Sequence, residues 1–366
     1  MEGCVSYGSL ILQKYGFLRI FAKMKTLLAL DSFKGCLTAP EAVDAAASAL
    51  AERDVCRLPL SDGGEGFAEC LAGCLGGVFR TVPVHDPLGR PIDARYALLE
   101  GGLIAVIETA AASGLTLLKP VELNPLTASS FGTGELMQDA VEQGVQEIWI
   151  GLGGTAVMDC GAGLLEALAP LPQTVRIHAF YDVDVPLTGP CGAPAVFGPQ
   201  KGADADGVAE LERRFRKHAE AWKEAYGIDA DQVPGAGAAG GIGAALAICL
   251  QAEMHAGIAA VLEAVRFPER LANCDLVLTG EGKADSQTLT GKVPYGILQA
   301  TKRLAPNIPV VLLAGKVEDR EELLAAGFNA VIQVTTEASM KGDYLDKSLA
   351  RENLRRAVQD LPYLRD

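Results

Sequence analysis

Five glycine-rich segments of this chain carry or adjoin an acidic residue, and these residue types suit phosphate chemistry. Glycine lets the backbone adopt positive φ and approach a ligand closely, so consecutive N–H groups can converge on an anion while nearby carboxylates hold Mg²⁺. One such segment would be weak evidence, but five recur at the ends of expected strands. The sequence therefore predicts a phosphate-handling site built from residues 61–66, 130–134, 151–155, 234–241 and 279–282.

Three acid-containing segments offer groups for catalysis or binding. Asp31 and Lys34 form a pair suited to orienting a hydroxyl nucleophile and neutralising a transferred phosphoryl group, although Lys34 is alternatively a solvated loop cation. Asp62 and Glu65 have the chemistry to ligate Mg²⁺ or bind substrate hydroxyls, and Glu65 is alternatively a helix cap. Glu108 ends an apolar strand, and we interpret it as a substrate contact in preference to an ion-paired structural acid.

Two of the glycine loops have competing interpretations. Residues 151–155 follow an expected strand and precede a helical pattern, so their N–H groups are predicted to cradle phosphates beside Asp159, a candidate metal or hydroxyl ligand. The alternative is a turn whose glycines only permit packing. Residues 235–240 match the pattern G-x-G-x-x-G, but Pro234 precedes them, so a tight turn into a helix is favoured over dinucleotide binding. No Gly-Lys pair precedes Ser or Thr as a Walker A loop requires.

A further polar group follows the apolar run at 276–278, where Glu281, Lys283 and Asp285 precede Lys292. Charged side chains at the end of a buried strand are costly unless they are used. These residues are therefore predicted to contact a ligand.

Composition restricts the class of protein. The chain has 366 residues, of which 49% are hydrophobic and 21% charged, which allows two globular domains. A net charge of -14 without a basic patch argues against a nucleic-acid partner. No apolar run reaches the roughly 18 to 20 residues of a transmembrane helix, so no membrane partner is expected. Nine cysteines without paired spacing fit reduced thiols and predict a cytoplasmic location.

Two further expectations concern metals and the chain start. The four histidines are scattered along the sequence, at His85, His178, His218 and His255, so no zinc-ligand cluster is predicted. Residues 1–23 lack the basic start and small-residue cleavage site of a signal peptide, and we interpret them as an extension preceding a fold that begins at Met24.

Alternating strand and helix patterns predict an α/β protein. A strand at 26–30 leads through Asp31 to a helix starting near Thr38, with Pro40 in its first turn and Glu41 three residues after Thr38. Strands and helices resume near the C-terminus, ending in a helix at about 344–361, whereas the short runs between 78 and 109 suggest antiparallel hairpins. Residues 24–77 and 268–366 are therefore predicted to form one doubly wound parallel sheet, with 78–267 inserted as a mixed α/β domain and the active site in the cleft between them.

Taken in order, these segments resemble the bacterial type 1 glycerate kinases from Met24 to near the C-terminus. The segments that carry the resemblance are 31–34 (Asp-Ser-Phe-Lys), 61–66 (Ser-Asp-Gly-Gly-Glu-Gly), 108–114, 132–135, 151–156 (Gly-Leu-Gly-Gly-Thr-Ala), 197–202 (Phe-Gly-Pro-Gln-Lys-Gly), 234–241, 279–282, 285–287 and 291–294. The resemblance implies a flavodoxin-like domain beside an inserted α/β domain. It also implies ATP-dependent phosphorylation of D-glycerate, usually at the 2-hydroxyl, with Mg²⁺. The chain departs from the family pattern at Met158 and Cys160, where Asn and Gly are common, at Asp184 and Val185, where Thr and Asn are usual, and at Lys283, which takes an Arg-like place.

Carried over by position, the resemblance adds Asp182 and Lys201 to the site. The predicted catalytic residues are Asp31, Lys34, Asp62, Asp159 and Lys201, and the predicted Mg²⁺ ligands are Asp62 and Glu281. The predicted substrate or phosphate contacts are Ser32, Gly63, Gly64, Glu65, Glu108, Ser113, Gly151, Gly153, Gly154, Thr155, Asp182, Gly235, Gly237, Gly240, Gly280, Glu281, Asp285 and Lys292. Three alternatives stay open: a kinase that forms 3-phosphoglycerate, one that acts on another small hydroxy acid, and a non-catalytic metabolite-binding protein. The oligomeric state is left open.

Overall fold

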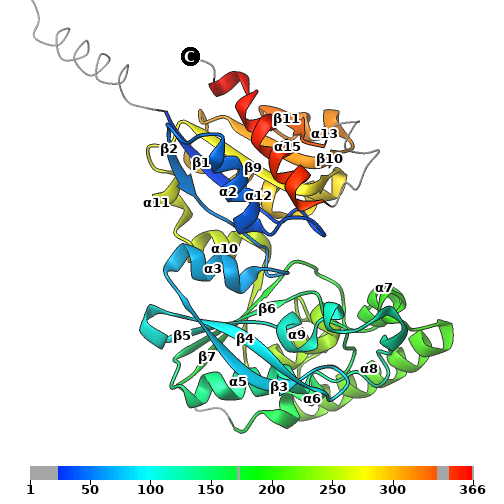
Figure 1. Ribbon diagram of the computed structural model, residues 1–366. Helices are drawn as coiled ribbons and strands as arrows, with labels where there is room; N and C mark the ends of the chain where they lie inside the picture. The colour runs from blue at the N-terminus through cyan, green and yellow to red at the C-terminus, as the bar shows by residue number, and fades with distance from the viewer. Residues whose placement is uncertain (1–23, 171–173, 336–345, 365–366) are drawn as a thin grey trace, which may run out of the picture.

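The computed structural model describes residues 24–170, 174–335 and 346–364. Figure 1 shows two lobes joined at a narrow waist, each built around one sheet. The extension predicted for residues 1–23 lies outside the described residues, as do the first two residues of the helix predicted at 344–361.

The upper lobe in Figure 1 contains a parallel sheet formed by both ends of the chain. Its strands are β1 (Lys25–Leu30), β2 (Asp54–Arg57), β9 (Leu276–Ala284), β10 (Val310–Val317) and β11 (Ala330–Gln333). They lie in the order β2-β1-β9-β10-β11, which is the 2-1-3-4-5 order of flavodoxin-like sheets. The predicted doubly wound sheet is therefore confirmed.

Both faces of this sheet are buried, as apolar strands without polar alternation require. Leu28 and Leu30 of β1 face α2 (Ala39–Ser48) and α15 (Lys347–Gln359), while Leu27 and Ala29 face the opposite side. The helices on that opposite side are α11 (Phe267–Leu271), α12 (Val293–Leu304) and α13 (Arg320–Ala325).

The start of α2 confirms the sequence prediction in detail. The Thr38 hydroxyl accepts the Glu41 N–H at 3.3 Å, and the Glu41 carboxylate accepts the Thr38 N–H at 3.0 Å. This capping box satisfies two backbone donors that the first helical turn leaves without partners.

The lower lobe contains a mixed sheet in the order β3-β4-β5-β6-β7-β8. The hairpins predicted between residues 78 and 109 are present, because β3, β4 and β5 pair antiparallel, whereas β5 to β8 pair parallel. The strands are β3 (Val78–His85), β4 (Pro91–Leu99), β5 (Ile104–Glu108), β6 (Glu147–Leu152), β7 (Arg176–Tyr181) and β8 (Glu253–Ala256). The helices of this lobe are α4 (Ala110–Ser113), α5 (Phe131–Glu142), α6 (Ala162–Ala167), α7 (Ala193–Phe197), α8 (Ala205–Tyr226) and α9 (Ala238–Cys249). Short 3-10 turns occur in both lobes. They occupy Glu100–Gly102, Leu115–Leu117, Pro120–Glu122, Pro199–Lys201, Ala230–Gln232, Ser286–Thr290 and Pro362–Leu364.

Two helices form the waist, α3 (Phe67–Leu75) and α10 (Gly257–Ala264), and Figure 1 shows them between the sheets. Phe67 of α3 and Ile258 of α10 belong to one buried cluster that also contains Leu27 of the upper sheet and Val106 of the lower sheet. The lobes thus share a hydrophobic core across the waist. The domain limits at residues 77 and 267 stay predictions. None of the helices in the described ranges is both long and apolar enough to cross a membrane.

Candidate active site

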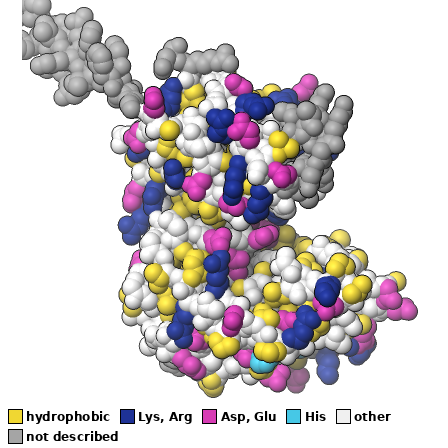
Figure 2. All heavy atoms as spheres, viewed as in Figure 1, with side chains coloured by type: hydrophobic (Ala, Val, Ile, Leu, Met, Phe, Trp, Pro, Cys, Tyr) yellow, Lys and Arg dark blue, Asp and Glu magenta, His cyan; other side chains and the backbone are white. Residues whose placement is uncertain are grey.

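The carboxyl ends of the parallel strands bring acidic residues together at the waist. Asp31 directly follows β1, and its N–H donates to Gly280 O of β9 at 2.9 Å, next to Glu281. These neighbours, β1 and β9, flank the point where the strand order reverses, which is where flavodoxin-like sheets bind ligands. Figure 2 shows the molecule hollowed on one side at this level, with acidic side chains gathered there.

Burial, followed by repulsion between neighbouring acids, changes the proton affinity of Asp31. Burial, with the nearby carboxylates of Asp62 and Glu281, raises the pKa of Asp31 to about 8 against the opposing effects of Lys34 and of the Ser32 N–H, which donates to Asp31 at 2.6 Å. A carboxyl group with such a pKa is mostly protonated at neutral pH. A cation that binds nearby lowers its pKa and so favours loss of the proton.

The lower lobe contributes Asp182, which follows β7. Asp182 is exposed at the surface. The surrounding protein still displaces water from its carboxyl group, and this effect and the charge of Asp62 raise the pKa of Asp182 to about 6, against the effects of Lys34 and Lys292. The structure therefore brings residues from both lobes to one place. We call Asp31, Asp62, Asp182 and Glu281 the carboxylate cluster.

Glu281 is the buried member of this cluster, with 6% of its surface exposed. It accepts the Thr288 hydroxyl proton at 2.6 Å and lies 3.6 Å from Lys292 Nζ. Burial raises the pKa of Glu281 despite these partners. Asp285 is different, because Lys283 pairs with it at 2.9 Å and lowers its pKa, and because it accepts the Gln287 N–H and so caps the turn at Ser286–Thr290.

Glycine is required where the two lobes touch. A Cβ on Gly63, whose φ is +104°, would lie 2.9 Å from Phe180 O. A Cβ on Gly151 would lie 2.6 Å from Gly63 O, and one on Gly153 would lie 2.9 Å from Gly64 Cα. All three distances are shorter than real Cβ contacts allow. The glycines of segments 61–66 and 151–155 thus let the Asp62 loop pack backbone to backbone on the lower sheet.

A helix follows residues 151–155 as predicted, but it does not begin directly at the loop. Gly151 and Leu152 still belong to β6, Thr155 forms an isolated bridge with Gly114, and α6 begins only at Ala162. The N-terminus of α6 therefore does not directly follow this loop. Gly154, with a φ of +66°, is the exposed residue of the loop.

Lys201 lies beneath the same loop. Its side chain is buried, with 3% of the residue exposed, and Nζ donates to Thr155 Oγ1 at 3.1 Å and to Val157 O at 2.9 Å. Burial lowers the pKa of Lys201 to about 7, although Asp159 acts in the opposite direction. An anion bound beside this amine would restore its charge.

Asp159 is engaged in holding the backbone. Its carboxylate accepts the N–H and hydroxyl of Ser130, both at 2.8 Å, and the N–H groups of Gly161 at 3.1 Å and Gly163 at 3.2 Å. These bonds stabilise the turn in which the backbone of Cys160 is left-handed, with a φ of +52°. A residue other than glycine in this conformation costs about 1–2 kcal/mol. The contacts favour a structural role for Asp159 over the predicted catalytic one.

The glycines at 235–240 are buried, and packing accounts for each of those predicted to bind phosphate. A Cβ on Gly235 would lie 2.8 Å from the Tyr181 ring, one on Gly237 would lie 2.5 Å from Val185 O, and one on Gly240 would lie 2.0 Å from Val157 O. Left-handed residues at the start of α9 confirm the tight turn into a helix.

Some of the remaining predicted residues are packed in the interior and others are exposed. Gly280 lies within β9, where a Cβ would meet Leu313 O at 2.2 Å, and Ser113 is buried with its hydroxyl 2.7 Å from that of Thr133. Glu65 is exposed just before α3. Two other surface pockets, one around Leu123 and Gly202 and one between α2 and α15, contain none of the predicted site residues.

Glu108 supports the Asp62 loop from the opposite lobe. It ends β5, and its carboxylate accepts the N–H groups of Gly66 at 3.3 Å and Ala68 at 2.8 Å. Gly66 is the N-cap of α3 and offers no side chain of its own, so Glu108 takes over the capping. Burial raises the pKa of Glu108 even though both N–H groups oppose this shift.

Glu108→Ala is expected to lower the free energy of unfolding by about 2 kcal/mol, because it leaves two partly buried donors without their charged acceptor. Urea denaturation followed by circular dichroism measures the loss. Glu166→Ala, which removes an exposed carboxylate from α6, is the matched control. Equal denaturation midpoints for the two variants would contradict the capping role.

The prediction that the histidines form no cluster of zinc ligands is wrong, because two of them lie close together in the folded protein. His178 of β7 and His255 of β8 lie together with Glu253, and their ligand atoms are all within 4.8 Å of one another. His178 is far from Glu253 and His255 in sequence, and neither strand was predicted, so spacing along the chain did not indicate the cluster.

Comparisons with known proteins agree with this arrangement. A sequence model of the glycerate kinase family matches residues 26–171 and 168–364. Glycerate kinase from Bacillus subtilis strain 168 is 38% identical, covering 92% of this chain and 97% of its own. Glycerate 2-kinase from Escherichia coli strain K12 is 37% identical, covering 86% and 91%. The crystal structure of a proposed glycerate kinase 2 from Salmonella typhimurium LT2 superposes with a TM-score of 0.78 at 37% identity, covering 92% and 97%.

Proposed function

Because this chain belongs to the glycerate kinase family, we propose that it transfers the γ-phosphoryl group of ATP to the 2-hydroxyl of D-glycerate, giving 2-phosphoglycerate. The observation that carries the proposal is the carboxylate cluster, in which acids from both lobes meet Lys34 and Lys292 at the switch point of a flavodoxin-like sheet. The E. coli relative, a glycerate 2-kinase, supports the choice of hydroxyl.

Asp31 is the proposed general base. It lies at the end of a central strand, and its pKa of about 8 gives it a proton affinity close to that needed to accept a hydroxyl proton near neutral pH. Asp31 would orient the 2-hydroxyl of glycerate and take its proton as the bond to phosphorus forms. The transfer is direct and in line, without a covalent enzyme intermediate.

Asp62 and Glu281 are the proposed Mg²⁺ ligands. The charge of Asp62 raises the pKa of both Asp31 and Asp182, and that of Glu281 also raises the pKa of Asp31. These carboxylates therefore crowd together and supply the negative oxygen ligands that a hard divalent cation requires. When bound, Mg²⁺ neutralises charge on the phosphates of ATP. Asp182 would hold the substrate from the opposite lobe.

Lys34 and Lys292 are the proposed partners of the transferred phosphoryl group, since both act on the charge of Asp182 and Lys34 also acts on that of Asp31. Lys201 and Thr155, beneath the exposed Gly154, are proposed to bind phosphate oxygens of the nucleotide. An amine with a pKa of about 7 gains charge when an anion arrives, so binding and protonation would be coupled.

The test is an assay of the purified protein with ATP, Mg²⁺ and D-glycerate, coupled to enolase with and without phosphoglycerate mutase. Product that enolase consumes directly supports phosphorylation of the 2-hydroxyl. Product that first needs the mutase places the phosphate on the 3-hydroxyl instead. Without any product, a panel of small hydroxy acids tests the second alternative, and ligand binding without ATP turnover would indicate a metabolite-binding protein. A cytoplasmic location and the absence of a nucleic-acid partner stay predictions.

A further inference from the structure

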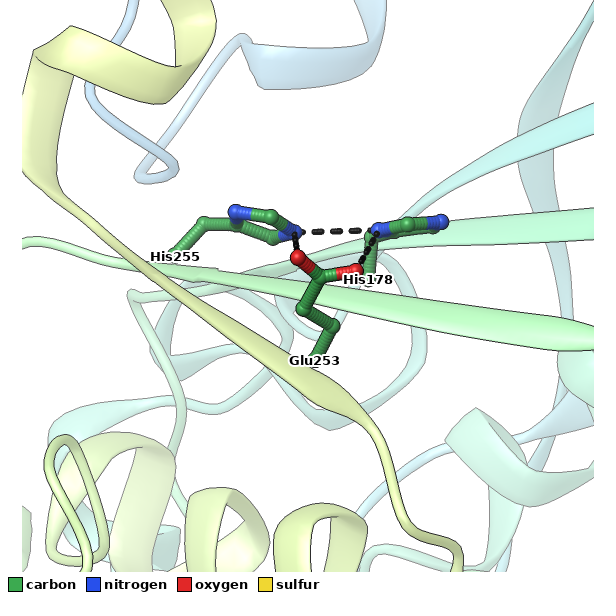
Figure 3. A group of neighbouring side chains, drawn as sticks. All are labelled: His178, Glu253 and His255. Carbon is green, nitrogen blue, oxygen red and sulfur yellow. Dashed lines mark hydrogen bonds and ion pairs between the residues drawn. The ribbon is translucent and has the colours of Figure 1, made fainter.

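Strand pairing in the lower sheet places two histidines and a glutamate on one face. In the parallel register of β7 and β8, His178 pairs with Glu253 and Phe180 pairs with His255. Since side chains two residues apart on a strand point to the same side, all three polar groups project together. Figure 3 shows one nitrogen of each imidazole and the carboxylate of Glu253 turned toward a common point.

The separations between these atoms suit a metal ion. His178 Nδ1 lies 3.0 Å from His255 Nε2 and 3.5 Å from one oxygen of Glu253, and His255 Nε2 lies 4.0 Å from the other oxygen. Tetrahedral coordination with bonds of 2.0–2.1 Å places neighbouring ligand atoms about 3.3 Å apart. Small rotations of exposed Glu253 and of the two rings would bring all three atoms to that spacing.

The surroundings of His178 supply an independent indication. Its second nitrogen, Nε2, is buried without a hydrogen-bond partner among the described residues, and it faces Glu147 at 3.7 Å. Glu147 is held in place by the indole N–H of Trp149 at 2.9 Å and by Arg176. A histidine that binds metal through one nitrogen usually donates its other N–H to a carboxylate of this kind.

From this geometry we propose a binding site for a divalent transition-metal ion of the zinc class, with His178 Nδ1, His255 Nε2 and Glu253 as ligands and water at the fourth position. Two imidazoles and one carboxylate form a donor set that zinc accepts, whereas Mg²⁺ prefers oxygen ligands alone. The site is therefore chemically distinct from the carboxylate cluster. Without metal, one imidazole N–H donates to the other ring across the same 3.0 Å.

The position of the site suggests what a bound ion would do. β8 is the edge strand of the sheet, it spans only Glu253–Ala256, and it leads directly into α10 at the waist. The His255 ring stacks on Phe180 with centroids 5.0 Å apart, and Phe180 O faces Gly63 beside Asp62. A metal bridging β7 and β8 would hold this short strand in register and stabilise the packing under the Asp62 loop.

The test is Co²⁺ titration of the full-length protein after removal of metal with a chelator, followed by visible absorption. A tetrahedral Co²⁺ site gives intense visible bands that octahedral Co²⁺ lacks, so the readout does not depend on kinase activity. One equivalent of Co²⁺ is expected to bind the native protein, and Zn²⁺ is expected to displace it and to raise Tm. His255→Asn should abolish the bands, and Glu253→Gln should weaken binding at least about tenfold.

His218→Asn is the matched control, because it removes a histidine that packs on Trp222 and is not one of the proposed ligands. It should bind Co²⁺ as the native protein does. The Glu253 side chain is 69% exposed, so the Glu253→Gln variant keeps the fold even if a change at His255 disturbs packing. The proposal is overturned if the native protein shows no tetrahedral bands with Co²⁺, or if Glu253→Gln and His255→Asn bind Co²⁺ as tightly as native protein.

Discussion

Asp31→Asn is expected to lower kcat for D-glycerate phosphorylation by about 10²–10⁴-fold, the range for loss of a general base. The asparagine side chain keeps the size and the acceptor oxygen that the Ser32 N–H contacts, but it cannot accept a proton. Steady-state kinetics with saturating ATP and Mg²⁺ measure the loss. Asp206→Asn, at an exposed position in the first turn of α8, is the matched control and should retain native kcat.

The pH profile separates a base from a merely structural acid. In the native enzyme kcat/KM should rise as pH increases toward about 8, where Asp31 of the free enzyme loses its proton, and Asp31→Asn should remove this rise. The free energy of unfolding should change in the opposite direction and fall as pH increases. Because the folded-state pKa exceeds the ordinary value of 3.8, the stability contributed by Asp31 is lost as pH rises from about 4 to about 8.

Asp31→Asn should therefore gain stability relative to the native protein over that pH range. A variant with native kcat, or one whose kcat/KM keeps the native pH dependence, would exclude Asp31 as the base.

Lys34→Ala is expected to lower kcat by about 10²–10³-fold, as the loss of one preorganised charge-stabilising group does in other enzymes. Lys34 is exposed and acts on both Asp31 and Asp182, so it is placed to neutralise charge that develops on the transferred group. Lys217→Ala, an exposed lysine of α8, is the matched control. Thermal unfolding of both variants should be close to native, because both lysines are exposed and charge interactions at the surface contribute little to stability.

A second role of Lys34 must be separated from the first. Lys34 lowers the pKa of Asp31, so its removal should shift the rise of kcat/KM to higher pH. If that were its whole effect, activity would recover fully above pH 9. A kcat deficit that persists there supports direct stabilisation of the phosphoryl group, whereas complete recovery would restrict Lys34 to tuning Asp31.

The sequence by itself predicted those features that depend on neighbours along the chain. The capping box of Thr38 and Glu41 involves residues three apart, and the hairpins between 78 and 109 join consecutive strands, so local patterns are enough. The order of motifs also indicated the family and the α/β class. Asp31, at the end of its strand, was correctly placed because β1 reads as a continuous apolar run.

Only the tertiary structure decided which side chains meet and which groups each one contacts. Asp159 looked like a ligand in the sequence, yet backbone donors from segments near 130 and 161 surround it. His178 and His255 looked unrelated, because their meeting depends on the register of β7 with β8. Register is set by burial of one face of the sheet against residues distant in sequence, and a shift by one residue would turn these histidines away. Spacing along the chain does not encode that alignment, whereas packing does.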